Sequence, residues 1–440
     1  MSKTYSRSLY WFTHDLRLSD NIALQTAQRQ SDALCYCYVI DKNSLSRGRY
    51  GMPSLGQQRL SFIWQSLQDL KHQLEQAGHQ LLIRVGEPLD EISQLISQYQ
   101  PEAVFAGLQN GVYERRRWQQ LQKQFRFIAF NASANSTLLS EHHLPFDEQQ
   151  FPASYSQFRR RLEPLSLSIT AKPEQPTNFD HKAMGGSTAP PLELTQNLSD
   201  TWLSGGESAA QRHLHSYFSS AAPATYKQTR NALDGFDQST KLSAYLAHGN
   251  LSPQQVINRL RKYEAEHGEN ESTYWIAFEL LWREYFFWYL RHYQERVFAV
   301  GGINNIKPQT TFYPARFKQW CCGTTPFPLV NACMKQLNQT GYMSNRGRQI
   351  VASCLVNELA IDWRYGAAYF EQQLLDYDIG SNWGNWQYIA GVGADPRGGR
   401  HFNLDKQTNQ FDPDGEFIAR WQGNTTRSMD STDAADWPVS

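Results

Sequence analysis

The sequence predicts an α/β domain built on a doubly wound parallel sheet, followed by an all-helical domain. Three observations lead to this fold class. The chain has 440 residues, which is more than one ordinary core accommodates. Short β-prone runs alternate with helical patterns in the first part of the chain, as is typical of parallel sheets. From Gly206 onward, apolar residues recur at helical spacing almost to the end.

Composition shifts set the expected domain boundaries. We expect an α/β domain over residues 1–134, an interdomain linker over 135–205, a helical domain over 206–422 and a disordered polar tail over 423–440. Between residues 163 and 206 the chain is rich in Pro, Ser, Thr and Gly, which indicates a linker running over the surface. The tail is polar and acidic, as frayed chain ends commonly are.

Five β-prone runs are predicted as the strands of the sheet, at residues 9–12, 33–40, 80–85, 103–106 and 125–130. Between the second and the third run, Leu60, Leu67 and Leu74 belong to a pattern at helical spacing. The turn after the first run reads THDLRLSDN and contains neither G-x-G-x-x-G nor G-x-x-x-x-G-K-[ST]. Because these phosphate-binding loops are missing, we expect any nucleotide cofactor to bind elsewhere.

Charge and cysteine usage exclude several classes of protein. The 42 basic and 42 acidic residues cancel, which argues against a wholesale electrostatic nucleic-acid binder but allows a local basic groove. The six cysteines form no C-x-x-C pair and no set with zinc spacing, so we expect reduced thiols and no metal. No signal-peptide pattern and no membrane-length apolar stretch is seen, so a soluble cytoplasmic protein is expected.

The stretch from Thr340 to Trp386 has the pattern of a ligand site. If a helix begins at Asn345, then Arg348 and Gln349 follow at i+3 and i+4 on the same face. Asp376, Asp378 and Asn382 then come close together in a predicted loop that contains Gly and Asn. Amide, guanidinium, carboxylate and indole groups are thus directed to one volume, which suits a large, polar aromatic ligand.

Two further segments allow two interpretations each. Ser239, Thr240 and Ser243 stand at the start of a predicted helix, where hydroxyls act as caps or, with the cation of Lys241, bind a phosphate. In FELLWREYFFW, Glu279, Trp282 and Arg283 share a helix face. A plain Glu279–Arg283 ion pair is the favoured interpretation in isolation. The alternative is an aromatic platform beside an acid.

These segments belong to blocks that resemble a known family. The opening YWFTHDLRLSDN is similar to the start of photolyases and cryptochromes. The blocks SYSQFR, GGESAA, YKQTRN, STKLSAYLAHGNLSP, TGYMSNRGRQIVASCL, LLDYDIGSNWGNW and KQTNQFDPDGEFIARW resemble the DASH branch of the cryptochromes. The likeness is collinear over nearly the whole chain, and only the linker and the tail have no counterpart.

The resemblance implies that the helical domain binds FAD in a folded, U-shaped conformation. Its diphosphate would lie among Tyr226, Ser239, Thr240, Leu242 and Ser243. The isoalloxazine and ribose would be surrounded by Asn345, Arg348, Asp376, Asp378 and Asn382, with Asn382 facing the reactive nitrogen. The bottom-up interpretation of the stretch from Thr340 to Trp386 agrees with this placement.

The resemblance also implies an activity, deoxyribodipyrimidine photo-lyase. Light-driven electron transfer from reduced FAD would split cyclobutane pyrimidine dimers, at a site formed by Glu279, Trp282, Asn345, Gln349, Asn382 and Tyr388. Tyr388 stands where ordinary dimer photolyases have a tryptophan. A phenol stacks less well than an indole, and flipping a base pair out of a duplex costs a few kcal/mol. The expected substrate is therefore single-stranded DNA.

Three other groups of residues are implied by the resemblance. Arg346, Arg397 and Arg400 would contact DNA phosphates, although ordinary surface solvation is an equal interpretation. Trp386 and Trp363 match the inner members of an electron relay, but Thr310 stands where its outermost tryptophan is usual, so Tyr313, Trp320 or another aromatic would have to substitute. Tyr113 and Glu114 match residues that contact a folate antenna, 5,10-methenyltetrahydrofolate, in the α/β domain.

Three functions remain open at this point. The first is repair of dimers in single-stranded DNA by a monomer that binds RNA or undamaged DNA more weakly and does not bind membranes. The second is a blue-light photoreceptor with weak or no repair activity. The third is a nucleic-acid-binding regulator in which FAD is structural. Glu279 and Trp282 favour repair, because a receptor needs neither an acid nor an indole beside an open pocket.

Overall fold

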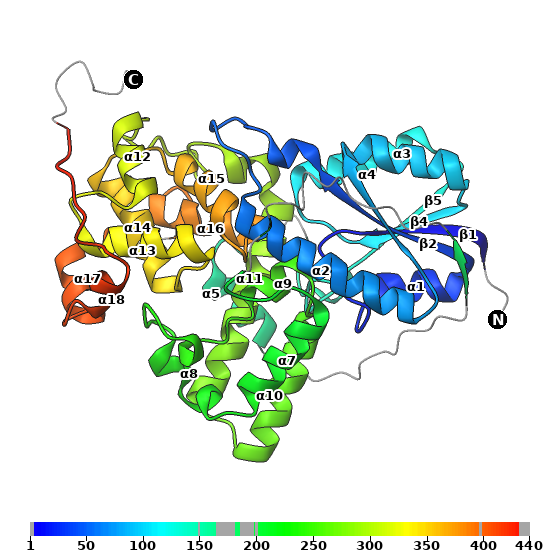
Figure 1. Cartoon of the computed structure of the whole chain (residues 1–440), viewed down its shortest axis with the longest axis horizontal. Coiled ribbons are helices and arrows are strands. Elements are labelled where there is room, and N and C mark those ends of the chain that lie inside the picture. Colours follow the sequence, from blue (N-terminus) through cyan, green and yellow to red (C-terminus); the bar gives the residue numbers. More distant parts are fainter. Residues whose placement is uncertain are drawn as a thin grey trace.

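The computed structural model describes residues 4–147, 150–163, 181–184, 198, 201–395 and 398–430. Figure 1 shows two parts side by side: a sheet flanked by helices, built from the blue and cyan segments, and a larger helical part coloured green to red. The fold class predicted from the sequence, an α/β domain followed by an all-helical one, is confirmed.

The sheet is parallel, with strand order β3-β2-β1-β4-β5. Its strands are β1 (Tyr5–Phe12), β2 (Ser31–Asp41), β3 (Leu81–Gly86), β4 (Ala103–Gly107) and β5 (Ala129–Ser133). The predicted run 125–130 is displaced. Phe125 instead ends the preceding helix by donating its backbone N–H to Leu121, and Phe127 is fully exposed in the turn, so the strand begins only at Ala129.

Helices cover both faces of the sheet, because successive strand residues point to opposite sides. Tyr10 and Phe12 pack with helices α1 (Ile22–Gln30) and α2 (Gln57–Gln76). Leu9 and Trp11 pack with α3 (Pro88–Tyr99) and α4 (Val112–Gln124) on the other side. This is the doubly wound arrangement.

The turn after β1 is filled by its own side chains. Tyr10 Oη donates to Asp15 Oδ2 at 2.5 Å, and Asn135 Nδ2 donates to the same oxygen at 3.0 Å and to Asn21 Oδ1 at 2.7 Å. Arg17 Nη1 donates to the carbonyl of Gly249, in the helical domain, at 3.0 Å. The turn that carries phosphate in many nucleotide-binding folds therefore fastens the two domains together here.

The expected linker contains structure that its composition did not predict. Strand β6 (Lys182–Met184) pairs in parallel with β2, and the buried His181 lies 2.7 Å from Tyr36 Oη. Helix α5 (Tyr155–Leu162) packs against the helical domain through the fully buried Phe158. The expected interdomain linker over 135–205 thus contains a helix and a strand, of which only β6 lies in the segment from 163 to 206 that was expected to run over the surface. Residues 164–180, 185–197 and 199–200 lie outside the described part of the chain.

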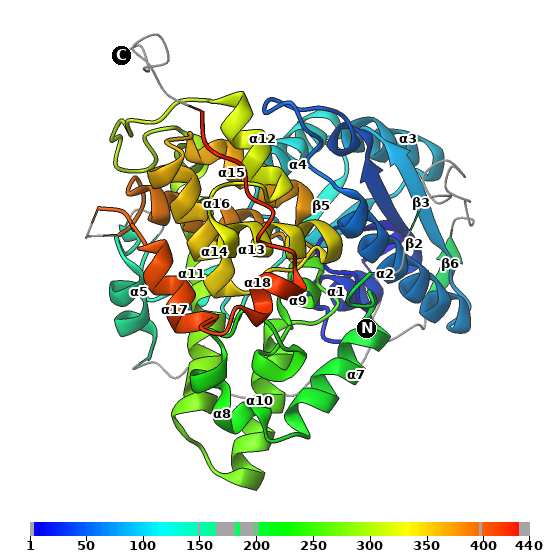
Figure 2. The same ribbon diagram turned by 60° about the vertical axis from the view of Figure 1, so that its left-hand side comes forward.

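The helical domain is organised around its longest helix, α11 (Glu271–Tyr293), which contacts α5, α8, α10 and α16. Figure 2 shows α11 behind α13 to α16, with α7, α8 and α10 below. The remaining helices are α7 (Glu207–Phe218), α8 (Ala222–Thr229), α9 (Ser243–His248), α10 (Pro253–His267), α12 (Pro314–Cys322), α13 (Pro328–Thr340), α14 (Asn345–Ser353), α15 (Trp363–Gln373), α16 (Ile379–Ala390), α17 (Leu404–Phe411) and α18 (Glu416–Arg420). Short 3₁₀ turns at Lys42–Leu45, Glu141–His143, Phe236–Gln238 and Gln294–Phe298 and a π-turn at Cys354–Glu358 complete the described part.

Helix α2 forms the seam between the two domains. Its N-cap Gly56 donates its backbone N–H to the carbonyl of Gln372 at 3.0 Å, and Ser66 Oγ accepts from the backbone of Gly206 at 3.0 Å. A side chain at Gly205 would overlap the carbonyl oxygen of Phe62. These close approaches hold the helical domain against the face of α2 that points away from the sheet.

The first part of the expected frayed tail is packed. Arg427 donates its backbone N–H to Thr324 at 3.0 Å, and the guanidinium of the buried Arg316 contacts Asp430 at 2.6 Å. The prediction of a frayed tail did not anticipate these contacts over residues 423–430, where one ion pair, backbone hydrogen bonds and the partly buried Met429 hold the segment. Residues 431–440 lie outside the described part.

Candidate active site

The predicted helix from Asn345 is confirmed as α14. Ser344 Oγ accepts from the backbone N–H of Gly347 at 3.1 Å and caps the helix, so Asn345 is its first residue. Arg348 and Gln349 follow one turn later on the same face. Asn345 is exposed and Gln349 is partly buried.

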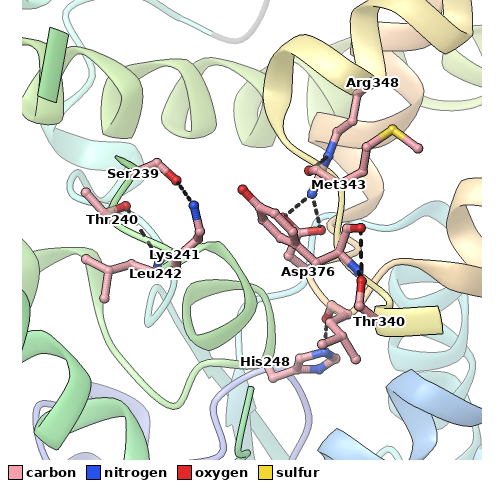
Figure 3. Close-up of polar contacts among 11 residues, drawn as sticks. Ser239, Thr240, Lys241, Leu242, His248, Thr340, Met343, Arg348 and Asp376 are labelled. Atoms are coloured by element: carbon pink, nitrogen blue, oxygen red, sulfur yellow. Dashed lines mark hydrogen bonds and ion pairs between the residues drawn. The ribbon is translucent and has the colours of Figure 1, made fainter. Parts of the chain in front are cut away.

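Arg348 and Asp376, which the sequence directs to one volume, form an ion pair (Figure 3). The Arg348 Nη2 donates to both carboxylate oxygens, at 2.8 and 3.0 Å, while Nε donates to the carbonyl of Met343 at 2.9 Å. The Asp376 side chain is only 8% exposed and that of Arg348 is 26% exposed. The pair is therefore anchored on its inner side and accessible on its outer side, where a polar ligand can contact it.

His248 fixes the loop that carries Asp376. Its Nε2 lies 2.8 Å from the carbonyl of Leu375 (Figure 3). Burial, with Arg59 nearby, lowers the pKa of His248 to about 3. The imidazole is therefore neutral near pH 7, and Nε2 must carry the proton that it donates to Leu375.

Asp378 and Asn382 do not lie in one loop, so that part of the prediction is wrong. Asp378 Oδ1 accepts from the backbone of Ser381 at 2.8 Å and caps α16, which places Asn382 inside the helix. The glycine and asparagine residues of this segment suggested a loop, but the cap at Asp378 starts a helix despite them. Asn382 Nδ2 donates to the carbonyl of Ala367 at 3.0 Å, which leaves Oδ1 as an acceptor.

Of the three predicted hydroxyl residues, Ser243 is the first residue of α9, whereas Ser239 and Thr240 lie in the segment that precedes the helix. Lys241 has a left-handed backbone with φ of 52°, and its Nζ donates to Ser239 Oγ at 2.7 Å (Figure 3). Thr240 Oγ1 accepts from the backbone of Leu242 at 3.5 Å. The Nζ of Lys241 also lies 4.9 Å from the ring of Tyr342, which precedes Met343, so this cluster adjoins the Arg348–Asp376 pair.

Lys241 is a buried cation. It is 6% exposed, and burial lowers its pKa to about 8. The charges of Asp234 and Asp237 oppose this fall without cancelling it. The cation is therefore incompletely compensated, which favours an anionic ligand beside it. Tyr226, on α8, is also buried, and burial with the charge of Glu279 raises its pKa.

Glu279 pairs with Arg230, not with Arg283. The Arg230 guanidinium donates to the Glu279 carboxylate and lies 4.3 Å from the ring centroid of Trp275. Burial raises the pKa of Glu279, and the charge of Arg230 opposes that rise. Arg283 instead donates to the carbonyls of Ser136 and Leu246. The favoured helix ion pair is therefore wrong, and the acid is held by Arg230 instead.

Arg230 was missed at the level of sequence. It lies in the block YKQTRN, which was used only to support the family likeness. Helical spacing relates Glu279 to Arg283, but nothing in the spacing relates Glu279 to a residue 49 positions earlier. Only the packing of α8 on α11 brings Arg230 to Glu279.

Trp282 lies between two tyrosines. The ring of Tyr155 stacks on it with centroids 3.7 Å apart at 12°, and the ring of Tyr388 meets it edge-on at 6.4 Å. Tyr155 therefore covers one face of the indole. A flat ligand stacked on Trp282 would have to use the rest of its surface.

The predicted phosphate-binding arginines have protein partners. Arg400 donates to Tyr388 Oη, and its Nε lies 2.7 Å from Asp395. The guanidinium of Arg346 lies 4.9 Å from the ring of Phe411, and its Nη2 lies 3.5 Å from Asn231 Oδ1. Arg397 lies outside the described residues.

The relay tryptophans lie in the core. Trp386 is 2% exposed and Trp363 is fully buried. The ring centroid of Trp386 lies 6.2 Å from that of Trp320, and that of Trp363 lies 5.8 Å from that of Trp383. Thr310, at the outer position, cannot extend an aromatic path.

A cavity of about 510 Å³ lies between the two domains. Tyr113 and Glu114, the predicted antenna residues, both line it, and Tyr113 is 64% exposed. Two polar atoms on its wall, Glu114 Oε2 and Asn110 Nδ2, are buried without a hydrogen-bond partner among the described residues. An acceptor and a donor are therefore available to a ligand in this cavity.

Two features are absent from the described residues. None of their helices combines the length and the apolar character that crossing a bilayer requires. No three or more His, Cys, Asp or Glu side chains in that part of the chain are grouped so as to hold a metal ion.

Comparisons with known proteins cover both domains. Residues 8–177 match the family described as DNA photolyase, and residues 275–437 match the FAD binding domain of DNA photolyase. The chain is 52% identical to cryptochrome DASH of Idiomarina loihiensis, over 99% of this chain and 97% of that protein. It is 46% identical to cryptochrome DASH of Vibrio parahaemolyticus, over 98% and 97% respectively. The crystal structure of a Synechocystis cryptochrome superposes with a TM-score of 0.88 at 36% identity, covering 96% of this chain and 89% of that one.

Proposed function

Because this chain belongs to the photolyase and cryptochrome family, in its cryptochrome DASH branch, we propose that it splits cyclobutane pyrimidine dimers in single-stranded DNA, using light and reduced FAD. The observation that carries the proposal is the partly buried Glu279, which Arg230 holds one helical turn from Trp282 on α11 and whose charge raises the pKa of Tyr226. Residues 206–422 would form the catalytic domain and residues 1–134 the antenna domain.

The residues around α9, α14 and α16 fit FAD. The incompletely compensated cation of Lys241, with Ser239, Thr240 and Ser243 beside it, suits a diphosphate. Tyr226 and Leu242 would enclose that part of the cofactor. The outer side of the Arg348–Asp376 pair, with Asn345 and Asp378, suits the polar edge of the flavin and its ribose.

The protein's part in the chemistry is to hold and orient FAD and the dimer. When bound, reduced FAD supplies the photoexcited electron that splits the dimer and takes it back afterwards. Asn382 Oδ1, fixed by the bond to Ala367, would accept a hydrogen bond from the flavin edge. Glu279, whose pKa is raised by burial, would donate to a carbonyl of the dimer. Arg230 keeps that carboxyl in place.

The preference for single strands rests on weak stacking. Tyr388 offers a phenol that is already engaged with Arg400, and Tyr155 covers one face of Trp282. Gln349 would add one polar contact at the pocket. Such a pocket repays little of the few kcal/mol that flipping a paired base costs. Arg346, Arg397 and Arg400 would contact the backbone phosphates, and RNA or undamaged DNA would bind more weakly.

The proposal is tested with purified protein, blue light, a reductant and a dimer-containing oligonucleotide, single- or double-stranded. Loss of the lesion should be faster on the single strand. Glu279→Gln should retain FAD and lose about tenfold or more in repair rate, since positioned proton donors contribute about 10²–10⁴-fold. Glu266→Gln, on the exposed face of α10, is the matched control. An FAD-loaded protein that repairs neither strand would contradict the proposal.

The second candidate is a blue-light photoreceptor with weak or no repair activity. The stacking of Tyr155 on Trp282 favours it, because a lesion then finds one indole face already covered. In that case Tyr155→Ala, which uncovers the indole, would increase binding of a dimer-containing oligonucleotide. Unchanged binding in this variant would remove the reason for preferring a receptor.

We also propose that the cavity between the domains holds a folate antenna, 5,10-methenyltetrahydrofolate. Its pterin presents an amino group and a ring N–H on one edge, with a carbonyl beside them. The unsatisfied Glu114 Oε2 suits the donors and the unsatisfied Asn110 Nδ2 suits the carbonyl. Tyr113, at the mouth, would cover the ligand.

The protein would work as a monomer.

A further inference from the structure

A line of aromatic rings continues beyond Trp363 toward the surface. The ring centroid of Trp383 lies 5.8 Å from that of Trp363, and Trp383 is only 4% exposed. The next ring is that of Tyr50, 6.3 Å from Trp383, and Tyr50 in turn lies 5.2 Å from Tyr365. Centroids about 4.5–7 Å apart are those of packed aromatic pairs. The four rings therefore form an unbroken line that begins in the core.

Tyr50 and Tyr365 bring this line to solvent. Both are half-buried, and the ring of Tyr365 stacks at 4.0 Å on that of Phe312, which is 38% exposed. Tyr50 belongs to the α/β domain, in the segment between the turn at Lys42–Leu45 and α2. Trp383 and Tyr365 lie on α16 and α15 of the helical domain. The line thus crosses the seam between the two domains.

A second line of rings reaches Tyr365 through a phenylalanine. The ring centroid of Trp320 lies 6.2 Å from that of Trp386 and 6.1 Å from that of Phe317. Phe317 then lies 5.7 Å from Tyr365. A benzene ring is much harder to oxidise than an indole or a phenol, so it interrupts stepwise electron transfer. Of the two lines, the first consists of Trp and Tyr alone.

We propose that Tyr50 replaces the outer tryptophan, whose position Thr310 occupies, as the last electron donor of the relay. This inference rests on the proposed FAD site and on the relay role of Trp386 and Trp363. Tyr50 loses one electron, which passes along the indoles and reduces the light-excited, oxidised FAD, and its phenolic proton passes to water. A thiol reductant in solution then returns one hydrogen atom to the tyrosyl radical.

The surroundings of Tyr50 suit loss of the proton together with the electron. Burial raises the pKa of Tyr50, so the phenol keeps its proton near pH 7 until it is oxidised. Among the charged groups near it, Arg364 and Asp362 form an ion pair, and the Arg49 guanidinium lies 5.9 Å from the ring centroid. An oxidised phenol is strongly acidic, and a nearby positive charge makes it more so. The product is therefore a neutral radical.

The test follows radicals in the full-length protein, loaded with oxidised FAD and free of DNA, after a light flash. Electron paramagnetic resonance identifies the radical, because ring-deuterated tyrosine changes its hyperfine pattern. The wild type should give a long-lived tyrosyl radical that forms more slowly in heavy water, since a proton leaves. Tyr50→Phe keeps the ring and removes the hydroxyl, so FAD content and melting temperature should stay unchanged. The tyrosyl signal should be lost, with the radical left on a tryptophan.

Other tyrosines provide the matched comparisons. Tyr369 lies 5.6 Å from Trp320, on the second line, and Tyr313 is a neighbour of Thr310 in the sequence. Tyr369→Phe and Tyr313→Phe should both keep the wild-type radical. Tyr50→Trp, which restores a ring that can be oxidised, should recover the yield of reduced FAD that Tyr50→Phe loses.

The outcomes separate this inference from the proposed function. A tyrosyl radical that survives in Tyr50→Phe, or a wild type with tryptophan radicals alone, would overturn the role of Tyr50 and leave dimer repair standing. Because no DNA is present, a protein that repairs no dimers can still show the tyrosyl radical and its loss in Tyr50→Phe. A protein that held no FAD would overturn both proposals.

Discussion

The turn after β1 and the cluster around α9 and α14 both gather polar side chains, yet only one is built for a ligand. In the turn, Asp15, Asn21 and Asn135 are at most 4% exposed and satisfy one another. In the cluster, the outer side of Arg348 remains accessible and the ammonium of Lys241 is buried with incomplete compensation. Residue types alone do not separate the two regions.

The two regions differ in whether their polar groups already have hydrogen-bond partners in the protein. A saturated buried network stabilises the fold and defines one arrangement of two domains. A network that keeps an unpaired donor, acceptor or charge is less stable than a complete one, and a ligand that supplies the missing partner recovers this free energy. Mutations in the turn should therefore lower the free energy of unfolding, whereas mutations in the cluster should lower the amount of bound flavin.

The largest effect is expected for Arg348→Leu. The variant leaves the 8% exposed Asp376 without its cation. The variant also removes the accessible guanidinium that would contact the flavin, so FAD binding should weaken by more than about 100-fold, which corresponds to about 3 kcal/mol. The flavin-to-protein absorbance ratio of the purified variant, followed by titration of the apoprotein with FAD, measures it. Arg316→Leu breaks another ion pair of the helical domain, with the exposed Asp430, and should lower the melting temperature while FAD affinity stays unchanged.

The reverse outcome is expected for Asp15→Asn, in the saturated turn. Tyr10 and Asn135 would meet an amide in place of a carboxylate that accepts from both. The loss should be about 2–3 kcal/mol of unfolding free energy, since buried donors are left poorly satisfied. Denaturant unfolding measures it. If Asp15→Asn released FAD from protein that is still folded, the contrast between the two regions would be wrong.

Some elements and contacts of the protein could be predicted from the sequence, and others could not. The first four strands and the α14 helix could be predicted, because periodicity and short spacings determine them. The Arg348–Asp376 pair, 28 positions apart, follows from no spacing, and the family resemblance indicated only that both residues surround the flavin. The partner of Glu279 could not be predicted, since Arg230 reaches it only through helix packing. Strand β6 could not either, because its three residues lie in a segment whose composition indicates a linker. Long-range contacts leave no local pattern.

Mutations in the buried aromatic path through Trp386 and Trp363 should change the rate of electron transfer and leave stability and FAD binding unchanged. We propose that Trp386 passes electrons to photoexcited flavin, with Trp363 next in the relay. Trp386→Phe should reduce the rate of FAD photoreduction about tenfold or more, while FAD content and the melting temperature stay close to the wild type, because a Trp-to-Phe exchange removes limited core volume. Trp320→Phe tests the branch 6.2 Å away. An unchanged photoreduction rate in Trp386→Phe would show that the relay runs elsewhere.

The smallest effect, and the most specific, concerns the pH dependence of FAD binding. Burial lowers the pKa of Lys241 to about 8, so the free protein loses this cation as the pH rises through 8. A diphosphate needs the charged form, and binding must then recover the proton. FAD affinity should fall by up to about tenfold per pH unit above 8.

The neighbours of Lys241 do not titrate in that window. Burial lowers the pKa of His213, and it raises the pKa of Tyr342 to about 12. Lys241→Met should therefore bind FAD more weakly at pH about 7 and show no further loss up to about 9.5. Lys227→Met, whose ammonium pairs with Glu271 at the surface, should keep the wild-type dependence. A dependence that survived in Lys241→Met would mean that another group supplies the cation.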